Sequence, residues 1–351
     1  MLLRDNFSEA HIRNLQKISQ RDPALLERAV YAFGLLEAIA RVKTPFIFKG
    51  GTCLMLLMEQ PRRLSTDIDI VVQPGTDLDG YIRKASEIFP FRQFEEQKRY
   101  SDSKIEKRHF KFTYTSPINN RPIYILLDVL FEYNHYDELV AKEIRNELLL
   151  TGPEYLTVSI PSADCILADK MTAFAPHTTG IPLNAKKDME VMKQFYDVCS
   201  LLDVFADYQK VSSTYTRIAQ AEILYRGISV SPADCLRDTF EAALCIASRG
   251  KTNTVEYPFY VKGIRNLRGH IYAENYTPEV AAVRSAKVLY MAACLLTETE
   301  FVPVNDPSEF AEQRIHCEDI MPLRYLRRAN LEAYAYTVKA DGLMNAKYVS
   351  T

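Results

Sequence analysis

The stretch Thr66-Asp-Ile-Asp-Ile-Val-Val72 alternates polar and apolar side chains before it ends in an apolar pair. This period of two is typical of a β-strand that is buried on one face only. Asp67 and Asp69 are then expected to project to one side of the strand, while Ile68 and Ile70 point into the core. Two carboxylates that share an exposed face are suited to bind Mg²⁺, which prefers oxygen ligands.

A third carboxylate interrupts an apolar run further along the chain. Asp128 stands within Ile123-Tyr-Ile-Leu-Leu-Asp-Val-Leu-Phe131, which is otherwise typical of a central buried strand. An unpaired carboxylate there is costly, so we expect a bound cation or a positioned partner. Asp67, Asp69 and Asp128 are therefore predicted to form one small cluster of metal ligands. The alternative is that Asp128 is only ion-paired, or caps a strand end at the rim of the sheet.

A glycine turn precedes the two aspartates. Pro45–Phe48 is a short β-prone run, and Lys49-Gly-Gly-Thr52 leads from it into an apolar helix expected over residues 53–58. Backbone N–H groups at a helix N-terminus can receive a triphosphate, and glycine permits close approach. A Gly-Gly turn is more often only a tight connection. Its place shortly before the aspartates favours phosphate binding.

The remaining pattern predicts two kinds of domain. Along the first half we expect helices over 22–41, 77–89 and 162–174 and strands over 110–115, 123–131 and 155–160. Beyond them, helical spacing of apolar residues recurs over 184–203, 210–225, 232–249, 278–297 and 322–338. The chain of 351 residues is long enough for two packed units. We expect an α+β domain with N-terminal helices over residues 1–180 and a helical domain over 181–351.

Composition excludes several classes of protein. With 47% apolar and 25% charged residues and no apolar run of membrane-spanning length, no membrane association is expected. Charges at Arg4, Asp5 and Glu9 stand where a signal peptide needs an apolar core, so the expected location is the cytoplasm. The seven cysteines include no C-x-x-C pair, and the six histidines are scattered. A disulfide framework and a zinc hydrolase are therefore not expected.

Overall charge gives no attraction to nucleic acid, because the formal net charge is −2. Any such partner would have to be held by local basic patches. The candidate patches are Lys104, Lys107, Arg108 and Lys111; Lys186 and Lys187; Lys262, Arg265 and Arg268; and Arg324, Arg327 and Arg328, which share one helical face. Each patch of this kind is more often a solvated surface than a binding site.

These motifs together resemble the nucleotidyltransferase superfamily related to DNA polymerase β, and more closely its AbiEii/AbiGii toxin family. The matching residues are Phe48-Lys-Gly-Gly-Thr-Cys-Leu-Met-Leu56 followed by Arg63-Leu-Ser-Thr-Asp-Ile-Asp-Ile70. The resemblance implies a polymerase-β-like head with a mixed sheet, followed by an α-helical body, and two Mg²⁺ ions held by Asp67, Asp69 and Asp128. It also implies that the nucleotide is bound by Lys49, Gly50, Gly51, Thr52, Arg63 and Ser65.

The family also carries a lysine on a helix after the sheet and an acidic segment some twenty residues later. Lys170 in Ile166-Leu-Ala-Asp-Lys-Met-Thr-Ala-Phe174 matches the lysine, which by resemblance binds the nucleotide phosphates. Lys193-Gln-Phe-Tyr-Asp197 keeps only the final aspartate, because Gln194 stands where the family usually has an acid. Asp197 either orients Lys170 in the catalytic site or only ties helices together.

The resemblance implies an enzyme that moves a nucleoside monophosphate from a nucleoside triphosphate to an acceptor. By resemblance the acceptor is RNA, such as transfer RNA, and the protein is a toxin of a bacterial toxin–antitoxin or phage-defence locus, restrained by a separately encoded antitoxin. One alternative keeps the chemistry but changes the acceptor to a small molecule or a protein. Another is a catalytically degenerate nucleotide-binding module. The retained carboxylates argue against it, because they repel one another without a cation.

Overall fold

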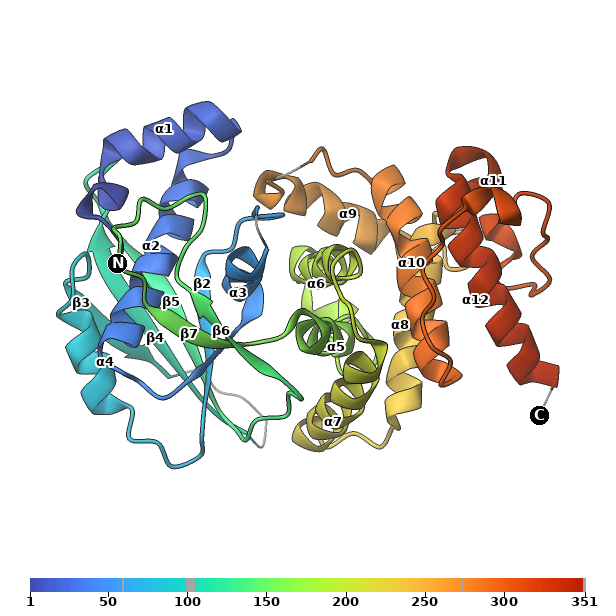
Figure 1. Ribbon diagram of the computed structural model, residues 1–351, viewed down its shortest axis with the longest axis horizontal. Coiled ribbons are helices and arrows are strands. Elements are labelled where there is room, and N and C mark those ends of the chain that lie inside the picture. The colour runs from blue at the N-terminus through green and yellow to red at the C-terminus, as the bar shows by residue number, and fades with distance from the viewer. Residues whose placement is uncertain (59, 99–104, 273, 350–351) are drawn as a thin grey trace. The chain divides into compact units, whose positions relative to one another are not determined.

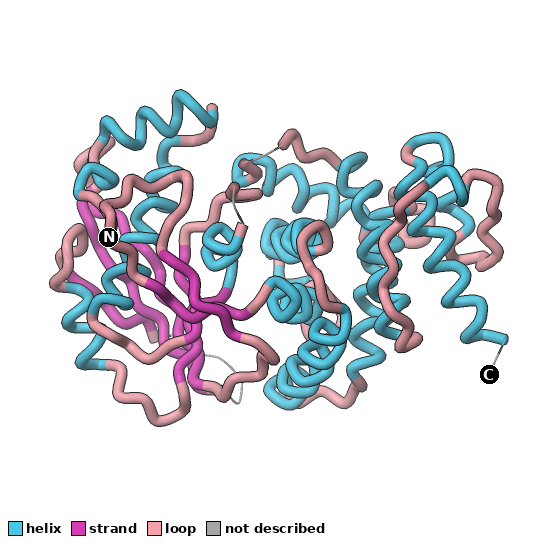
Figure 2. The backbone as a smooth tube through the Cα atoms, in the orientation of Figure 1, coloured by secondary structure: helices cyan, strands magenta, loops and turns pink. Residues whose placement is uncertain are grey.

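The computed structural model of the chain describes residues 1–58, 60–98, 105–272 and 274–349, so Lys104 lies outside the described residues. The chain forms two compact units. The first comprises Met1–Ser162 and Gly269–Glu274, and the second comprises Ala163–Arg268 and the residues from Asn275 onward. Within the described residues every strand belongs to the first unit, while the second consists of helices and loops (Figure 2).

The first unit is built on one seven-stranded sheet, with strand order β3-β4-β5-β2-β1-β7-β6 (Figure 1). The pairs β2–β5 and β1–β7 are parallel and the other neighbouring pairs are antiparallel, so the expected mixed sheet is confirmed. The strands are β1 Ile47–Lys49, β2 Asp67–Val72, β3 Gln93–Gln97, β4 Glu106–Thr115, β5 Pro122–Phe131, β6 Leu139–Glu143 and β7 Thr157–Pro161.

One face of the sheet is covered by helices of the same unit. The helices of the unit are η1 Arg4–Phe7, α1 Glu9–Ser19, α2 Pro23–Arg41, α3 Gly50–Leu57 and α4 Asp79–Ser86. Helix α2 begins after Asp22, whose side chain accepts from the Ala24 N–H, and it contacts β2 and β5. Ile68 and Ile70 of β2 are fully buried, whereas Asp67 and Asp69 are half-buried. The alternation of the sequence therefore decides which side chains the core receives.

A short segment returns to the first unit from the second half of the sequence. The Leu64 N–H donates to the His270 carbonyl at 2.7 Å, and the Tyr272 N–H donates to the Arg62 carbonyl at 2.9 Å. These bonds fix the backbone on both sides of Arg63, immediately before β2. No local pattern in the sequence indicates this return, which joins residues about two hundred positions apart.

The second unit is helical, as expected. Its helices are α5 Ala163–Ala173, η2 Leu183–Ala185, α6 Asp188–Leu201, α7 Tyr208–Arg226, α8 Pro232–Ala247, α9 Tyr257–Leu267, α10 Pro278–Leu296, η4 Pro307–Phe310, η5 Met321–Tyr325, α11 Leu326–Ala329 and α12 Leu331–Val349; η3 Arg268–His270 spans the passage between the units. Helix α5 packs on α6 and α7, which places it in the second unit. The domain division near residue 180 stays a prediction. In the described part of the chain, no helix combines the length and apolarity needed to cross a membrane.

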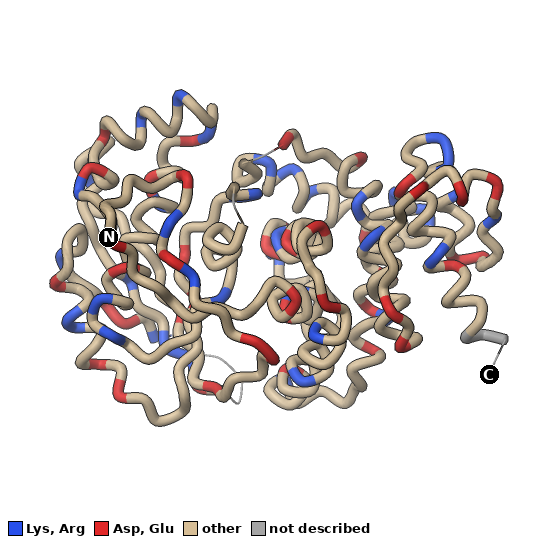
Figure 3. Tube along the Cα trace, viewed as in Figure 1, with Lys and Arg blue, Asp and Glu red and all other residues tan. Residues whose placement is uncertain are grey.

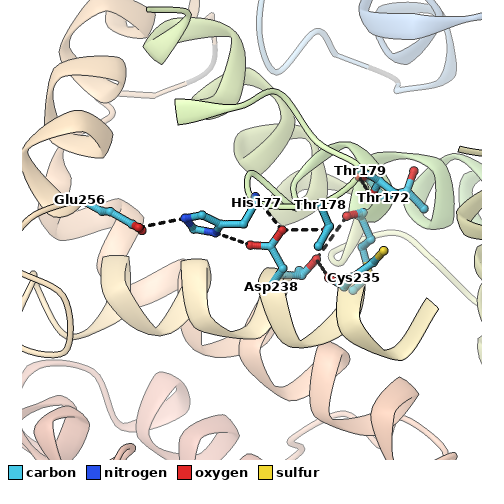
Figure 4. Close-up of polar contacts among 9 residues, drawn as sticks. Thr172, His177, Thr178, Thr179, Cys235, Asp238 and Glu256 are labelled. Atoms are coloured by element: carbon cyan, nitrogen blue, oxygen red, sulfur yellow. Dashed lines mark hydrogen bonds and ion pairs between the residues drawn. The ribbon is translucent and has the colours of Figure 1, made fainter. Parts of the chain in front are cut away.

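The buried Asp238 and its partner His177 connect three parts of the second unit: helix α8, the connection between α5 and α6, and the start of α9. Asp238 on α8 is 5% exposed and binds the connection between α5 and α6 through both of its oxygens. The His177 N–H donates to Asp238 Oδ2 at 2.8 Å, and the imidazole Nδ1 lies 2.7 Å from Oδ1. The imidazole Nε2 lies 2.9 Å from Oε1 of Glu256, at the start of α9. Figure 4 shows the ring held between the two carboxylates.

This arrangement raises the pKa of His177. Burial opposes the charged imidazolium, but the hydrogen bonds and negative charges of Asp238 and Glu256 outweigh that effect. The folded state therefore binds the proton more tightly than the unfolded state does. The resulting stabilisation is fully present below the unfolded pKa of about 6.5 and is lost as the pH rises through the raised folded pKa.

We predict that His177→Gln lowers the melting temperature at pH 5.5 and has a smaller effect at pH 9. The side chain is 46% exposed, so the loss at pH 5.5 should be about 1 kcal/mol or less. Thermal unfolding at the two pH values measures it. His316→Gln is the control, because His316 is 71% exposed and its ring lies 3.4 Å from Asp341. A His177→Gln effect of equal size at both pH values would contradict the proton linkage.

Candidate active site

The three aspartates singled out by the sequence lie on neighbouring parallel strands. In the register of β2 and β5, Asp69 pairs with Asp128 and Asp67 pairs with Leu126. Directly paired residues of adjacent strands project to the same face, so all three carboxylates share one face of the sheet. Their neighbours Ile68 and Leu127 are fully buried on the other face. The sheet thus brings together acidic groups that are about sixty positions apart in sequence.

Asp67 and Asp128 each contact a basic side chain within the first unit. The Asp128 Oδ1 lies 2.6 Å from Nδ1 of His109, which is its register partner on β4. Asp67 Oδ1 lies 3.7 Å from a guanidinium nitrogen of Arg28 on α2. The Asp128 carboxylate therefore has a hydrogen-bonding partner at one of its two oxygens. A hydrogen bond at Oδ1 does not preclude a further ligand at Oδ2.

The arrangement of the three aspartates bears on the predicted metal site. Over the described ranges, no three or more His, Cys, Asp or Glu side chains are gathered as a metal site requires. Asp128 contacts His109, and Asp67 contacts Arg28. The three carboxylates share a face of the sheet, and the metal site that they would form stays a prediction. Carboxylate oxygens are the ligands that Mg²⁺ prefers, and the three aspartates lie on one face of the sheet.

The glycine turn lies directly against Asp69. Gly50 opens α3 with a φ of +81°, a left-handed conformation that glycine adopts at little cost. A Cβ at this position would overlap the carboxylate oxygen Oδ2 of Asp69. At Gly51 a Cβ would lie 2.6 Å from Ser65 Oγ and 2.7 Å from Arg63 Nη2. Both glycines are therefore needed for the close approach of α3 to the acidic and basic side chains beside it.

The other predicted nucleotide-binding residues surround this turn. Lys49 pairs with Asp69 in the register of β1 and β2 and so shares its face, with Nζ 5.8 Å from the centre of the Tyr136 ring. Arg63 is only 6% exposed. Thr52 is fully buried, and its hydroxyl donates to the Asp67 carbonyl at 2.6 Å. The Thr52 side chain therefore fixes α3 to β2, and only its backbone N–H remains suited to contact a nucleotide.

Lys170 and Asp197 meet in the second unit. Lys170 Nζ on α5 lies 3.0 Å from Asp197 Oδ2 on α6, and it donates to Gln194 Oε1 at 2.9 Å. Both charged side chains are buried, with 7% and 2% exposure. A buried ammonium group requires compensation of this kind. The contact with Asp197 both holds the Lys170 ammonium in place and joins α5 to α6, so it fits either predicted role of Asp197. Gln194 supplies a neutral acceptor for the same ammonium.

Two residues beside the carboxylates were not predicted from the sequence. His109 occupies a position of β4 where polar residues alternate with the buried Phe110 and Phe112, so the pattern predicts its exposed face but not its partner. Arg28 lies on α2, and no pattern in the sequence marked it. The partner of each depends on how distant segments pack.

The site combines a glycine turn that opens a helix, a neighbouring strand that carries Asp-x-Asp, and a third aspartate on the adjoining strand. This combination defines the class of nucleotidyltransferases. Residues 35–257 match the family model described as "Nucleotidyl transferase AbiEii toxin, Type IV TA system". The chain belongs to this AbiEii family, and it is a nucleotidyltransferase toxin. Membership implies a nucleoside triphosphate substrate and an antitoxin partner.

Comparison with solved structures gives weaker likenesses. The crystal structure of JHP933 from Helicobacter pylori is 13% identical, covers 78% of this chain and 93% of that chain, and has a TM-score of 0.44. An antigenic nucleotidyltransferase-like protein from Paracoccidioides brasiliensis is 16% identical, covers 56% of this chain and 88% of that chain, and has a TM-score of 0.36. No curated protein matches the sequence. The family match alone carries the assignment.

We predict that Gly50→Ala disrupts the site far more than Gly75→Ala does. Both glycines are left-handed, with φ of +81° and +83°, but a Cβ at Gly75 would have no atom within 4 Å. Gly75→Ala should cost about 1–2 kcal/mol from the backbone alone. Gly50→Ala should cost more and abolish nucleotidyl transfer, because it displaces the Asp69 carboxylate. Urea unfolding and an activity assay on both variants measure the difference, and equal effects would contradict the role given to Gly50.

Proposed function

We propose that this toxin transfers a nucleoside monophosphate from a nucleoside triphosphate to RNA in a reaction that requires Mg²⁺. The observation that carries the proposal is the pairing of Asp69 with Asp128, with the turn at Gly50 packed against the Asp69 carboxylate. Acidic oxygens suit a divalent cation, and the start of a helix suits a phosphate. Their adjacency supports a reaction at a triphosphate.

In this proposal Asp67, Asp69 and Asp128 hold the metal. Two bound Mg²⁺ ions would stabilise the negative charge on the attacking and leaving oxygens. Arg28 neutralises part of the acidic charge, and the contact with His109 restricts where the Asp128 carboxylate points. Hydrogen bonds of this kind to a ligating group orient it and tune its basicity. His109 is therefore a positioning residue for Asp128.

The triphosphate would be received at the start of α3. Gly50 and Gly51 lack side chains, so a phosphate can approach their backbone N–H groups. Lys49 and Arg63 supply positive charge there, and Ser65 supplies a hydroxyl. Lys170 keeps the role that its family resemblance gives it, as a point charge for the phosphates, with Asp197 as the residue that orients it.

The acceptor we favour is RNA, such as transfer RNA, because family resemblance supports it. A small hydroxylated molecule or a protein side chain is the alternative. Inhibition by a separately encoded antitoxin and a role in phage defence within the cytoplasm complete the proposal. Incubating the protein with each labelled triphosphate, Mg²⁺ and total cellular RNA and protein distinguishes the acceptors, because the label appears in only one fraction.

We predict that Asp69→Asn abolishes label transfer without unfolding the protein. The change keeps the shape of the side chain but removes a charge from a group of mutually repelling carboxylates. Activity should fall by about 100-fold or more, because charge stabilisation at the transferred phosphoryl group is lost. Label incorporation and thermal unfolding are measured side by side.

A growth experiment tests the cellular consequence. Expression of the wild-type chain without its antitoxin should slow bacterial growth, and Asp69→Asn at equal expression should relieve the effect. Equal inhibition by both proteins would show that toxicity does not depend on nucleotidyl transfer. Label in RNA from the Asp69→Asn protein at the wild-type rate would overturn the proposed metal role.

Lys170 has two proposed roles, one in the stability of the protein and one in binding the triphosphate, and a pair of variants separates them. Lys170→Met leaves Asp197 buried without its cation and should destabilise the protein by about 3–5 kcal/mol. Adding Asp197→Asn removes the unpaired charge and should restore most of the stability. Triphosphate affinity should stay at least about tenfold below wild type in both variants, because the point charge is lost. Wild-type affinity in the double variant would reduce Lys170 to a structural residue.

A further inference from the structure

An arginine groove lies in the C-terminal part of the second unit. It has a volume of about 770 Å³ and is lined by Arg314, Arg324, Arg327 and Arg328 together with Tyr325 and Tyr334. Figure 3 shows Lys and Arg at α11, where two of these arginines, Arg327 and Arg328, lie. None of its described lining residues is acidic. The site residues already discussed include none of this groove.

The positive charge of the groove is only slightly compensated. Arg327 forms an ion pair of 2.8 Å with Glu312, whose side chain is 92% exposed. Such a surface pair is worth little and can be exchanged for another anion. Across the part of the chain that the structure describes, Arg314, Arg324 and Arg328 are in no ion pair, and all three are exposed. Bringing these cations together has an electrostatic cost that an anionic ligand would offset.

The walls of the groove are fixed by the fold. The Tyr325 hydroxyl donates to the Ala247 carbonyl at 2.8 Å, and the Tyr334 hydroxyl donates to the Gln313 carbonyl at 2.6 Å. Two further cations flank the Tyr325 ring: Arg249 at 4.9 Å and Lys251 at 5.8 Å from its centre. The arginines are therefore presented along a rigid surface whose positive charge continues onto the connection between α8 and α9.

We propose that the arginine groove binds the phosphodiester backbone of the acceptor nucleic acid. Every groove cation is an arginine, whose planar fork matches phosphate oxygens in pairs. Because the positive charge is spread over several segments, it suits a chain of phosphates better than a single ion. The choice of a nucleic acid over an acidic protein rests on the proposed function, which supplies a polyphosphate acceptor.

Fluorescence anisotropy with a labelled 20-nucleotide RNA tests the groove. The full chain carrying Asp69→Asn is used without nucleotide or Mg²⁺, so that no transfer occurs. Arg324→Gln/Arg328→Gln should weaken binding by about tenfold and reduce the slope of log K against log salt by about 1.4, which is 0.7 for each lost phosphate contact. Arg217→Gln/Arg226→Gln on α7 removes the same charge elsewhere in the unit and should change affinity less than about twofold.

Further measurements distinguish phosphate binding at the groove from a general effect of charge and from binding of an acidic protein. DNA of the same sequence should bind with similar affinity, because the phosphodiester chemistry is shared. Arg324→Lys/Arg328→Lys keeps the charge, is checked for folding by circular dichroism, and should lose less affinity than the glutamine pair. Equal weakening by the α7 pair, or unchanged binding by the groove pair, would overturn the proposal. Groove-dependent binding of a polyglutamate peptide in preference to RNA would assign the groove to an acidic protein instead.

The two proposals fail in distinguishable ways. RNA binding that depends on the groove, together with label transfer to a small molecule, would keep the groove as a phosphodiester-binding site and reject RNA as the acceptor of the reaction. Label transfer to RNA without any effect of the groove variants would reject the groove alone.

Discussion

Burial of Ile68 and Ile70 beneath α2 is the constraint on which the acidic face of this protein depends. Because side chains alternate along a strand, burying these two residues forces Asp67 and Asp69 to the opposite face. A slip of one residue in β2 would exchange the two sets and drive both carboxylates into the core, at several kcal/mol for each unpaired charge. The hydrophobic core therefore fixes the acidic face before any ligand contributes.

That fixed face concentrates negative charge, and the surrounding residues moderate it. His109 and Arg28 reach the outer carboxylates from β4 and α2, while Gly50 allows α3 to begin in contact with the carboxylate of Asp69. The start of a helix carries partial positive charge, which stabilises a nearby anion. The same helix terminus and the nearby Arg63 also suit an approaching triphosphate. In the proposed function, structural neutralisation and substrate recognition would therefore use the same groups.

The sequence predicted those parts of the fold that local patterns encode. Strands β2 and β5 and helices α2, α8 and α10 follow from alternation, apolar runs, and caps such as Asp22, and the shared face of Asp67 and Asp69 follows from the same rule. Strand β3 was missed because its residues are exposed at nearly every position and show no alternation. The partnership of His109 with Asp128 and the return of residues 269–274 depend on long-range register, which a single sequence does not encode.

Gln194 shows how a departure from the family pattern can still preserve a site. An acid at this position would place two carboxylates around the Lys170 ammonium and leave the buried group with a net charge of −1. With glutamine the Lys170 ammonium still donates to this position, at 2.9 Å, while Asp197 supplies a carboxylate 3.0 Å away. Glutamine adds no buried charge, so it needs no second cation to be stable when buried. The substitution is therefore compatible with an active enzyme, because it retains the acceptor that positions Lys170 and removes only a charge.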